Sequence, residues 1–234
     1  MTTTTLYAPH VSAETPPARA CTPQARVTGS LLGYGILAGP FYVAVSLAQA
    51  AVRDGFDLSR HEWSLLANGP GGWVQSANLA LTGLMVLAAA CGFARALRTG
   101  PGSRWAPRLL AVYGAGLIAA GAFRADPMDG FSVGTPDGPP VGPTVHGALH
   151  LAAAGTGFLA LVAACVLLSR RFAQQGRTGQ ARFTAVTAAG FLVAFAGLAA
   201  SGGSVATNAV FTTAVILTWT WLSVTSLQHF RSLS

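Results

Sequence analysis

Two histidines four residues apart, His146 and His150, are the side chains whose spacing in this sequence most directly suggests chemistry. A separation of four residues in a helix places two side chains about 40° apart on one face and one turn apart in depth. Such a pair can bind one metal ion, with zinc as the candidate cofactor, or relay a proton. It can also hydrogen-bond to neighbouring helices without any chemical role, and the spacing alone leaves these uses open.

Polar residues that could work with the histidine pair gather in residues 60–64, RHEWS, and in residues 123–131, FRADPMDGF. Arg124 stands at the end of an apolar stretch, where a guanidinium facing lipid is costly without a carboxylate partner. We expect that partner to be Asp126 or Asp129, either as a salt bridge that folds the loop or as part of a functional site. The candidate residues are Asp126, Asp129 and Ser64 for catalysis; Arg124, Glu62, Trp63, Trp73 and Gln75 for substrate or partner binding; and His61, His146 and His150 for metal.

Signatures of soluble enzymes do not occur in the sequence. There is no G-x-S-x-G, no H-E-x-x-H and no G-x-x-x-x-G-K-[ST], which are the patterns of serine hydrolases, zinc proteases and phosphate-binding loops. The segment that starts at Asp126 does not match a calcium-binding loop, because Met128 occupies a position that needs an oxygen ligand. The candidate residues therefore define no known soluble activity by themselves.

The elements that must position these residues are membrane helices. Of the 234 residues, 52% are hydrophobic and only 9% are charged, whereas soluble domains carry about 25% charged residues. Residues 183–230, a run of 48, contain no Asp, Glu, Lys or Arg. That run is long enough for two membrane spans and a turn, which need about 45 residues. The composition predicts an all-α, polytopic membrane helix bundle.

The chain divides into a tail, a membrane domain and a short end. Residues 1–27 are rich in Thr, Pro and Ala and predict a disordered cytoplasmic tail. Residues 28–229 form the predicted six-span domain and residues 230–234 a cytoplasmic end. The predicted spans are 28–52, 73–96, 106–123, 144–169, 183–201 and 205–228, each close to the length that one span requires. An alternative interpretation of the first stretch is a signal peptide with an A-x-A-like cleavage site near Ala50.

The distribution of arginine predicts which way the spans point. All 14 basic residues are Arg, and cytoplasmic loops retain positive charge. Eleven of them fall in the tail, the second and fourth loops and the C-terminus, whereas six of the seven acids fall in the first and third loops. Both termini are therefore predicted to be cytoplasmic. Clusters between spans do not form the single basic stripe of a nucleic-acid-binding protein. Exclusive use of Arg, with much Ala and Gly, indicates a bacterial plasma membrane protein.

The positions of tryptophans and amides suggest anchoring and helix contacts. Trp63 and Trp73 fall at the predicted outer interface, and Trp105, Trp219 and Trp221 near the inner one, where amphipathic rings are favoured. Buried amides in a bilayer must find partners, so those of the outer half either line an outward-open cavity or connect helices. They are Gln49, Gln75, Asn78 and Asn208. The inner half has almost no such groups, which argues against a simple channel.

A family resemblance rests on four segments: residues 61–66, HEWSLL; residues 72–75, GWVQ; residues 124–136, from RADPMDGF to GTP; and residues 146–150, HGALH. With these segments the chain resembles, over roughly residues 30–228, the bacterial membrane family known as domain of unknown function 998. The loop containing Asp126 and Pro127, followed by the paired histidines, is the most specific part. The resemblance implies six spans and no particular reaction.

Three functions compete at this stage. The first is a non-catalytic membrane protein whose outer site binds a lipid, a small molecule or a partner. The second is a metal-dependent hydrolase, similar in outline to the alkaline ceramidase-like membrane hydrolases, in which zinc activates water. That resemblance would assign roles to Ser64, Asp126, His61, His146 and His150. The third is a membrane cyclase or isomerase that uses Asp126, Asp129 or Glu62 as an acid, which requires a carboxyl group with a raised pKa.

Overall fold

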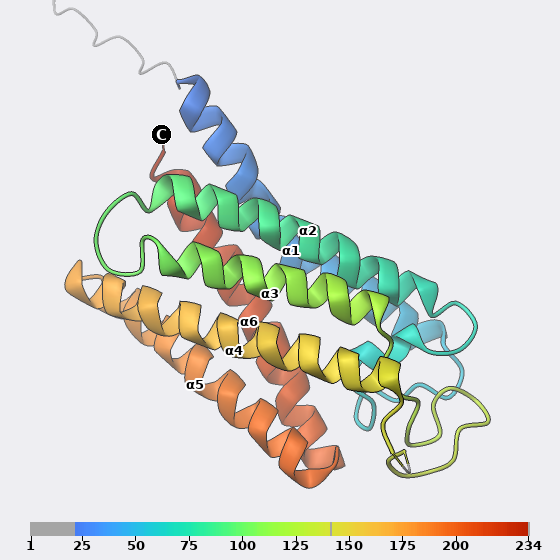
Figure 1. The fold of residues 1–234 in the computed structure, drawn as a ribbon. Helices are drawn as coiled ribbons and strands as arrows, with labels where there is room; N and C mark the ends of the chain where they lie inside the picture. Colours follow the sequence, from blue (N-terminus) through green and yellow to red (C-terminus); the bar gives the residue numbers. More distant parts are fainter. Residues whose placement is uncertain (1–21, 141, 234) are drawn as a thin grey trace, which may run out of the picture.

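The computed structural model describes residues 22–140 and 142–233, which form six long α-helices and one short 3-10 helix (Figure 1). The helices are α1 (Pro23–Val52), η1 (Trp63–Ala67), α2 (Trp73–Ala96), α3 (Trp105–Ala122), α4 (Val145–Gln174), α5 (Thr178–Ser201) and α6 (Val205–Arg231). The all-α class and the six predicted helices are confirmed. Helix α1 begins earlier than the predicted residue 28, and most of the predicted tail, residues 1–21, lies outside the described residues.

Hydroxyl side chains begin three of the long helices. Thr22 accepts a hydrogen bond from the amide of Ala25, and Thr144 caps α4 in the same way through Gly147. Ser204 accepts from Thr207 at the start of α6. These caps satisfy amide groups that have no partner within the helix. Gly202 ends α5 in the left-handed conformation, with φ 64°, which a glycine adopts without steric cost.

Five of the helices are long and apolar enough to cross a membrane: α1, α2, α4, α5 and α6. Helix α3 is the shortest, with 18 residues, and therefore spans about 27 Å, slightly less than the hydrocarbon core of a bilayer. Arg108 lies in its first turn. The protein is a multi-pass membrane protein by the composition of its helices, and α3 remains the sixth predicted span.

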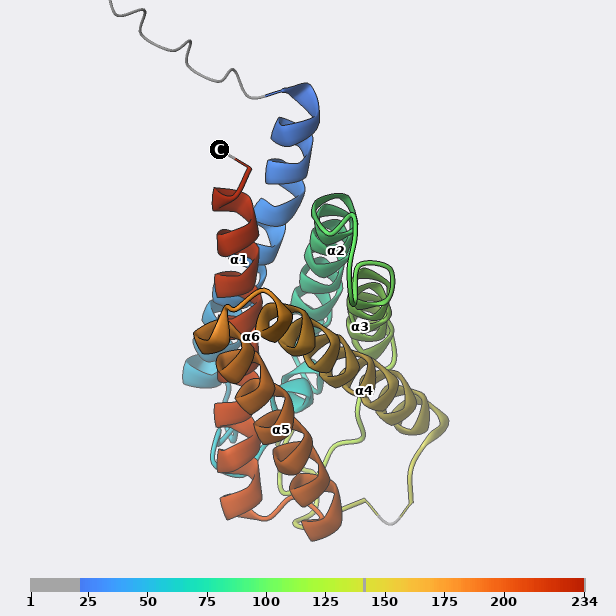
Figure 2. The same ribbon diagram turned by 90° about the vertical axis from the view of Figure 1, so that its left-hand side faces the viewer.

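The six helices form a closed ring in which each packs against its neighbours in sequence and α6 returns to α1. The start of α1 and the end of α6 lie at one end of the bundle (Figures 1 and 2), where Phe230 lies against Gly29. At the same end, Arg171 donates to the carbonyl oxygen of Pro101, over 3.2 Å. The opposite end, here called the loop end, comprises the connections 53–72, 123–144 and 202–204. It carries the six acids that the sequence grouped together.

Small residues bring neighbouring backbones together around α3. A Cβ atom at Gly83 would lie 2.6 Å from the carbonyl oxygen of Gly114, and one at Gly116 would lie 2.8 Å from that of Ala153. Helix α3 is thus pressed between α2 and α4. Close backbone approach of this kind drives helix association in lipid, where apolar burial contributes little.

An amide network joins α1 to α2 in the half of the bundle near the loop end. Gln75, which is fully buried, accepts through Oε1 from Gln49 at 2.8 Å, from Ser46 at 3.2 Å and from Asn78 at 3.2 Å. Asn78 also donates to the carbonyl oxygen of Tyr42, at 3.1 Å. Two atoms of this amide network, Gln49 Oε1 and Gln75 Nε2, have no partner among the described residues. The amide network connects helices, as one of the two sequence interpretations proposed.

Candidate functional site

A cavity of about 430 Å³ extends from the loop end into the interior of the bundle. Every helix contributes to its wall, with the largest share from α3, α4, α5 and α6. Its inner part is lined by aromatic rings, and these are Tyr42, Tyr113, Phe158, Phe191, Phe211 and Trp219. Its outer part is lined by the polar side chains of the two loop stretches that the sequence singled out. The cavity therefore changes from polar to apolar with depth.

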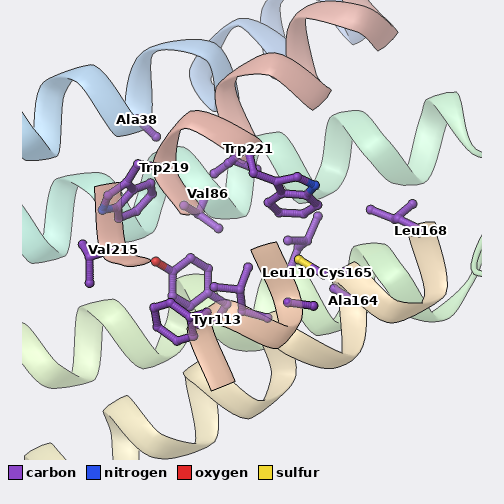
Figure 3. Packing of buried hydrophobic residues seen from close by; sticks show 14 of the residues in the cluster. Ala38, Val86, Leu110, Tyr113, Ala164, Cys165, Leu168, Val215, Trp219 and Trp221 are labelled. Atoms are coloured by element: carbon purple, nitrogen blue, oxygen red, sulfur yellow. The ribbon is translucent and has the colours of Figure 1, made fainter. Parts of the chain in front are cut away.

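The aromatic rings of the inner part are in contact with one another across helices. Tyr42 lies 5.1 Å from Trp219 and 5.8 Å from Trp63 between ring centroids. Tyr113 lies 5.9 Å from Trp219, and Figure 3 shows both rings reaching into the interior from α3 and α6. Phe158 continues the series, 5.0 Å from Phe191. Rings held on five different α-helices make a wall whose shape depends on the whole bundle.

Glu62, at the outer end of the cavity, takes part in no ion pair among the described residues. The ion pair that the described residues do form joins Arg60 to Asp137 at 3.6 Å. Burial raises the pKa of the Glu62 carboxyl, and the nearby charge of Asp129 raises it further, whereas its own backbone amide and His61 act in the opposite direction. A carboxyl group in this position gains its proton at a higher pH than an exposed glutamate does.

Asp126 closes the other side of the outer part and is tied to the start of α4. Its carboxylate accepts from the amide of Thr144 at 2.9 Å and from the hydroxyl of Thr144 at 2.6 Å. A Cβ atom on Gly147 would collide with the carboxylate oxygens. The absence of a side chain at Gly147 thus lets Asp126 lie against the first turn of α4, where the helix dipole favours negative charge.

Two further polar groups line the cavity with unused hydrogen-bonding capacity. Trp63 is only 3% exposed, and its indole Nε1–H has no partner among the described residues. His150 Nδ1 lies 2.8 Å from the carbonyl oxygen of Phe123 and 3.0 Å from that of Ala120. Because carbonyl oxygens only accept, Nδ1 carries the proton and Nε2 is left as an acceptor. Ser64, the second residue of η1, also lines the cavity.

The loop that carries Glu62 and Trp63 is held in place by His61. Its Nδ1 accepts from the amide of Asp57 at 2.8 Å, and its Nε2 donates to the carbonyl oxygen of Asp129 at 3.0 Å. Its ring lies 5.5 Å from that of Phe131. Since both ring nitrogens are used and the side chain is 1% exposed, His61 joins the first loop to the third and has no free position for a metal ion.

The structure does not bring together the three histidines that the sequence suggested as metal ligands. His61 is used by the loops, His150 binds backbone carbonyl oxygens, and His146 is exposed, with its ring 5.8 Å from that of Phe123. Within residues 22–140 and 142–233, no three His, Cys, Asp or Glu side chains are placed to hold one metal ion. The i, i+4 spacing places His146 and His150 on one helix, but His61, the third predicted ligand, is bound within the loops.

Other predicted site residues divide between the cavity and its surroundings. Gln75 belongs to the amide network and is not a lining residue. Trp73 is 73% exposed at the start of α2. Arg124 is exposed and forms an ion pair with neither of its expected partners, Asp126 and Asp129, and the Asp126 carboxylate binds Thr144 instead. Asp129 offers the carbonyl oxygen that His61 binds. Glu62, Trp63, Ser64, Asp126 and His150 do line the cavity.

Sequence reasoning missed the aromatic wall. Trp219 and Trp221 were predicted as anchors at the inner interface, but they are 3% and 0% exposed. Trp219 lines the cavity, and Trp221 donates to Thr184 Oγ1 at 3.0 Å. The available signal was the presence of Tyr42 and Tyr113 in the middle of predicted spans, because tyrosine in membrane helices is concentrated at the interfaces.

Fold and cavity together define a multi-pass helical membrane protein with an internal, aromatic-lined cavity that is polar at one end. The chain matches the family described as "Protein of unknown function (DUF998)" over residues 36–228, and it belongs to that family. The comparisons with curated proteins and with solved structures gave no match.

Proposed function

We propose that this protein binds a membrane-soluble amphipathic molecule in the cavity. The single observation that carries the proposal is the polarity gradient of the cavity, which runs from Glu62, Ser64 and His150 at the loop end to rings such as Phe191 and Phe211 inside. Binding sites for small molecules are concave and mostly apolar, with a few polar groups that fix orientation. The volume of about 430 Å³ is in the range of such sites.

We further propose that the loop end faces away from the cytoplasm of a bacterial cell. Most arginines lie at the end of the bundle where α1 begins and α6 ends, and six acids lie at the loop end. This distribution supports the orientation, because positive loops stay in the cytoplasm. A ligand would then reach the polar opening from the outer leaflet or from the space beyond it. A reporter that is active only in the cytoplasm, fused after Ser132, is expected to be inactive; activity there would contradict the orientation.

Quenching of tryptophan fluorescence by a brominated amphiphile tests the binding proposal. Trp63 and Trp219 line the cavity, whereas Trp73 and Trp105 are exposed, so the experiment uses the double variant with both exposed tryptophans changed to Phe. The protein is reconstituted in nanodiscs of neutral lipid, and 12-bromododecanol is added in small mole fractions. Because bromine quenches only at short range, a bound chain gives saturable quenching. Linear quenching with no saturation would overturn the proposal.

A cavity-filling variant makes that test specific. Ala154 lines the cavity on α4, whereas Ala152, on the same helix, is exposed and lies outside it. We expect Ala154→Phe to weaken the saturable component at least tenfold, and the matched control Ala152→Phe to leave it unchanged. Equal effects of the two substitutions would show that the quenching reports on the bilayer.

Acid catalysis on the bound molecule is a second candidate function, and one observation favours it. A cyclase or isomerase of the kind considered from the sequence needs a carboxyl group with a raised pKa, and Glu62 is such a group within the cavity. Mass spectrometry of molecules that co-purify with the protein tests this. Catalysis predicts that Glu62→Gln retains a different, unconverted molecule. The same bound molecule in both proteins would contradict it.

A further inference from the structure

We infer that the cavity selects a hydrophobic organic cation, whose charged nitrogen lies at the outer end between Glu62 and the nearest aromatic rings. This inference rests on the proposed function and deepens it by naming the class of ligand. The chemistry meant is an amine or quaternary ammonium group attached to an apolar chain or ring system. Three features of the cavity support it: the signs of the charges in its wall, the position of its rings and the shortage of internal counter-ions.

The charged side chains that the structure describes in the cavity wall are acidic. Glu62 and Asp126 line the outer part, and none of the arginines within residues 22–140 and 142–233 is a lining residue. The arginines closest in sequence are used elsewhere or face outward. Arg53 donates to the carbonyl oxygens of Leu66 and Asn68 and covers the Phe131 ring at 5.3 Å. A protein whose formal net charge is +7 thus presents a locally negative cavity.

The lack of a counter-ion for Glu62 points to a cationic ligand. Glu62 takes part in no ion pair among the described residues, and burial disfavours its charged form. A ligand cation beside the carboxylate would supply the missing partner. An anionic ligand would meet two carboxyl groups and find no guanidinium, so the same wall discriminates against it.

Aromatic rings next to Glu62 provide a second contact for the cation. Trp63 follows Glu62 directly in the chain, and its ring begins the series that continues through Tyr42 to Trp219 and Tyr113. The faces of such rings attract cations, and tryptophan does so most strongly. Tyr113 is 4% exposed, so the inner rings are dry and suit the apolar part of the molecule. The cavity therefore combines carboxylate and ring contacts in the order that an amphipathic cation requires.

Three brominated amphiphiles with the same chain and different head groups test the inference. The probes are 12-bromododecyltrimethylammonium, 12-bromododecanol and 12-bromododecyl sulfonate, each compared as a mole fraction within neutral nanodiscs that contain the variant lacking the exposed tryptophans. We expect the ammonium probe to bind at least tenfold more tightly than the alcohol, and the sulfonate most weakly. This comparison needs no change at Glu62 and decides the question even if variants of Glu62 do not fold.

A pair of charge-neutralising substitutions assigns the selectivity to Glu62. We expect Glu62→Gln to weaken binding of the ammonium probe at least tenfold and that of the alcohol less than threefold. The matched control, Asp54→Asn, removes an exposed acid of the same loop that lies outside the cavity and should change neither.

The outcomes separate this inference from the proposed function. Saturable binding of the alcohol with no preference for the ammonium probe would overturn the inference and leave the proposed function standing. An equal loss for both probes in Glu62→Gln would also overturn it, because Glu62 would then shape the cavity without reading charge. If no probe gives saturable quenching, both the proposed function and the inference fail.

Discussion

The amide network and the cavity treat buried polar groups in different ways. On the α1–α2 side, the amides of Gln49, Gln75 and Asn78 bind one another and do not line the cavity. Around the cavity, Glu62, the Trp63 indole and His150 have hydrogen-bonding capacity left over. Polar groups in a membrane protein must find partners. The amide network finds most of its partners within the chain, although Gln49 Oε1 and Gln75 Nε2 have none among the described residues, and the cavity leaves room for a molecule from outside.

The difference also separates stability from function. Removing a member of the amide network leaves its former partners buried and unpaired, which costs stability. Glu62 takes part in no ion pair among the described residues, so under the proposed function the main effect of neutralising it should fall on ligand binding. If the amide network and the cavity are independent, a substitution in one should leave the other unchanged. The expected effects follow, from the largest to the smallest.

Gly147→Ala is expected to cause the largest change, because the added methyl group displaces the Asp126 carboxylate from the first turn of α4. The loss of its hydrogen bonds to Thr144, together with overpacking, should lower the free energy of unfolding by about 2–3 kcal/mol. Titration with SDS in mixed micelles measures this. Displacement of Asp126 from the outer end of the cavity should also weaken binding of the ammonium probe.

Gly155→Ala is the matched control on the same helix. A Cβ atom there would lie 3.9 Å from the nearest ring atom of Phe195, which is ordinary contact. The substitution should leave stability equal or slightly higher, by up to about 1 kcal/mol, because alanine favours a helix more than glycine does. Equal destabilisation by both substitutions would mean that helix α4 tolerates no added methyl group and that Asp126 has no special role.

The pH dependence of cation binding follows from the raised pKa of Glu62. Below that pKa the carboxyl group is neutral and attracts the cation less, so affinity falls as the pH falls and is retained above it. For one coupled proton, the dissociation constant of the ammonium probe should rise by about tenfold per pH unit at most. The midpoint should lie above the ordinary pKa of a glutamate. Quenching titrations from pH 4 to pH 9 measure the profile.

Neighbouring titratable groups define the control for that profile. Asp129 and His61 act on Glu62 directly, and Asp126 and His150 line the same cavity. Glu62→Gln should therefore flatten the profile, and the part that survives belongs to the other groups. An unchanged profile in this variant would remove Glu62 from the explanation.

Gln75→Leu tests the amide network. It removes the oxygen that accepts three hydrogen bonds, and leaves Gln49 and Asn78 with fewer partners. We expect the free energy of unfolding to fall by about 1–2 kcal/mol, while the alcohol and ammonium probes bind as before. Gln174→Leu, at an exposed position near the end of α4, should change neither quantity. Weaker probe binding in Gln75→Leu would show that the amide network and the cavity are coupled.

The sequence predicts features that depend on neighbouring residues better than contacts between residues that are far apart in the chain. Runs of apolar residues report helices directly, since each span must satisfy its own backbone, and the six helices follow. The grouping of acids at one end also followed from the loops. The partner of each polar side chain did not follow, because Asp126 and Thr144 meet only when a loop of 17 residues folds back. Spacing along one helix, as in His146 and His150, fixes relative direction and leaves open which way the pair faces.

Burial of the tryptophans was the most instructive difference. Trp219 and Trp221 lie near the end of an apolar stretch, where interfacial rings are common, yet both point into the bundle. In a ring of six helices the inward face is set by packing between α6, α1 and α5, and hydropathy carries no information about that rotation. The aromatic wall of the cavity could be assembled only once those rotations were known.

Two substitutions two residues apart on α6 give the smallest and most discriminating expected effect. Trp221→Phe removes the hydrogen bond from the indole to Thr184 and should lower the free energy of unfolding by about 1 kcal/mol, with probe quenching retained. Trp219→Phe removes an indole that lines the cavity and has no hydrogen bond among the described residues. It should cost less stability but abolish most of the saturable quenching, because the emitting group nearest the bound chain is gone. If Trp221→Phe instead removed that quenching, the brominated chain would occupy the α5–α6 interface near Thr184. The cavity described above would then not be the binding site.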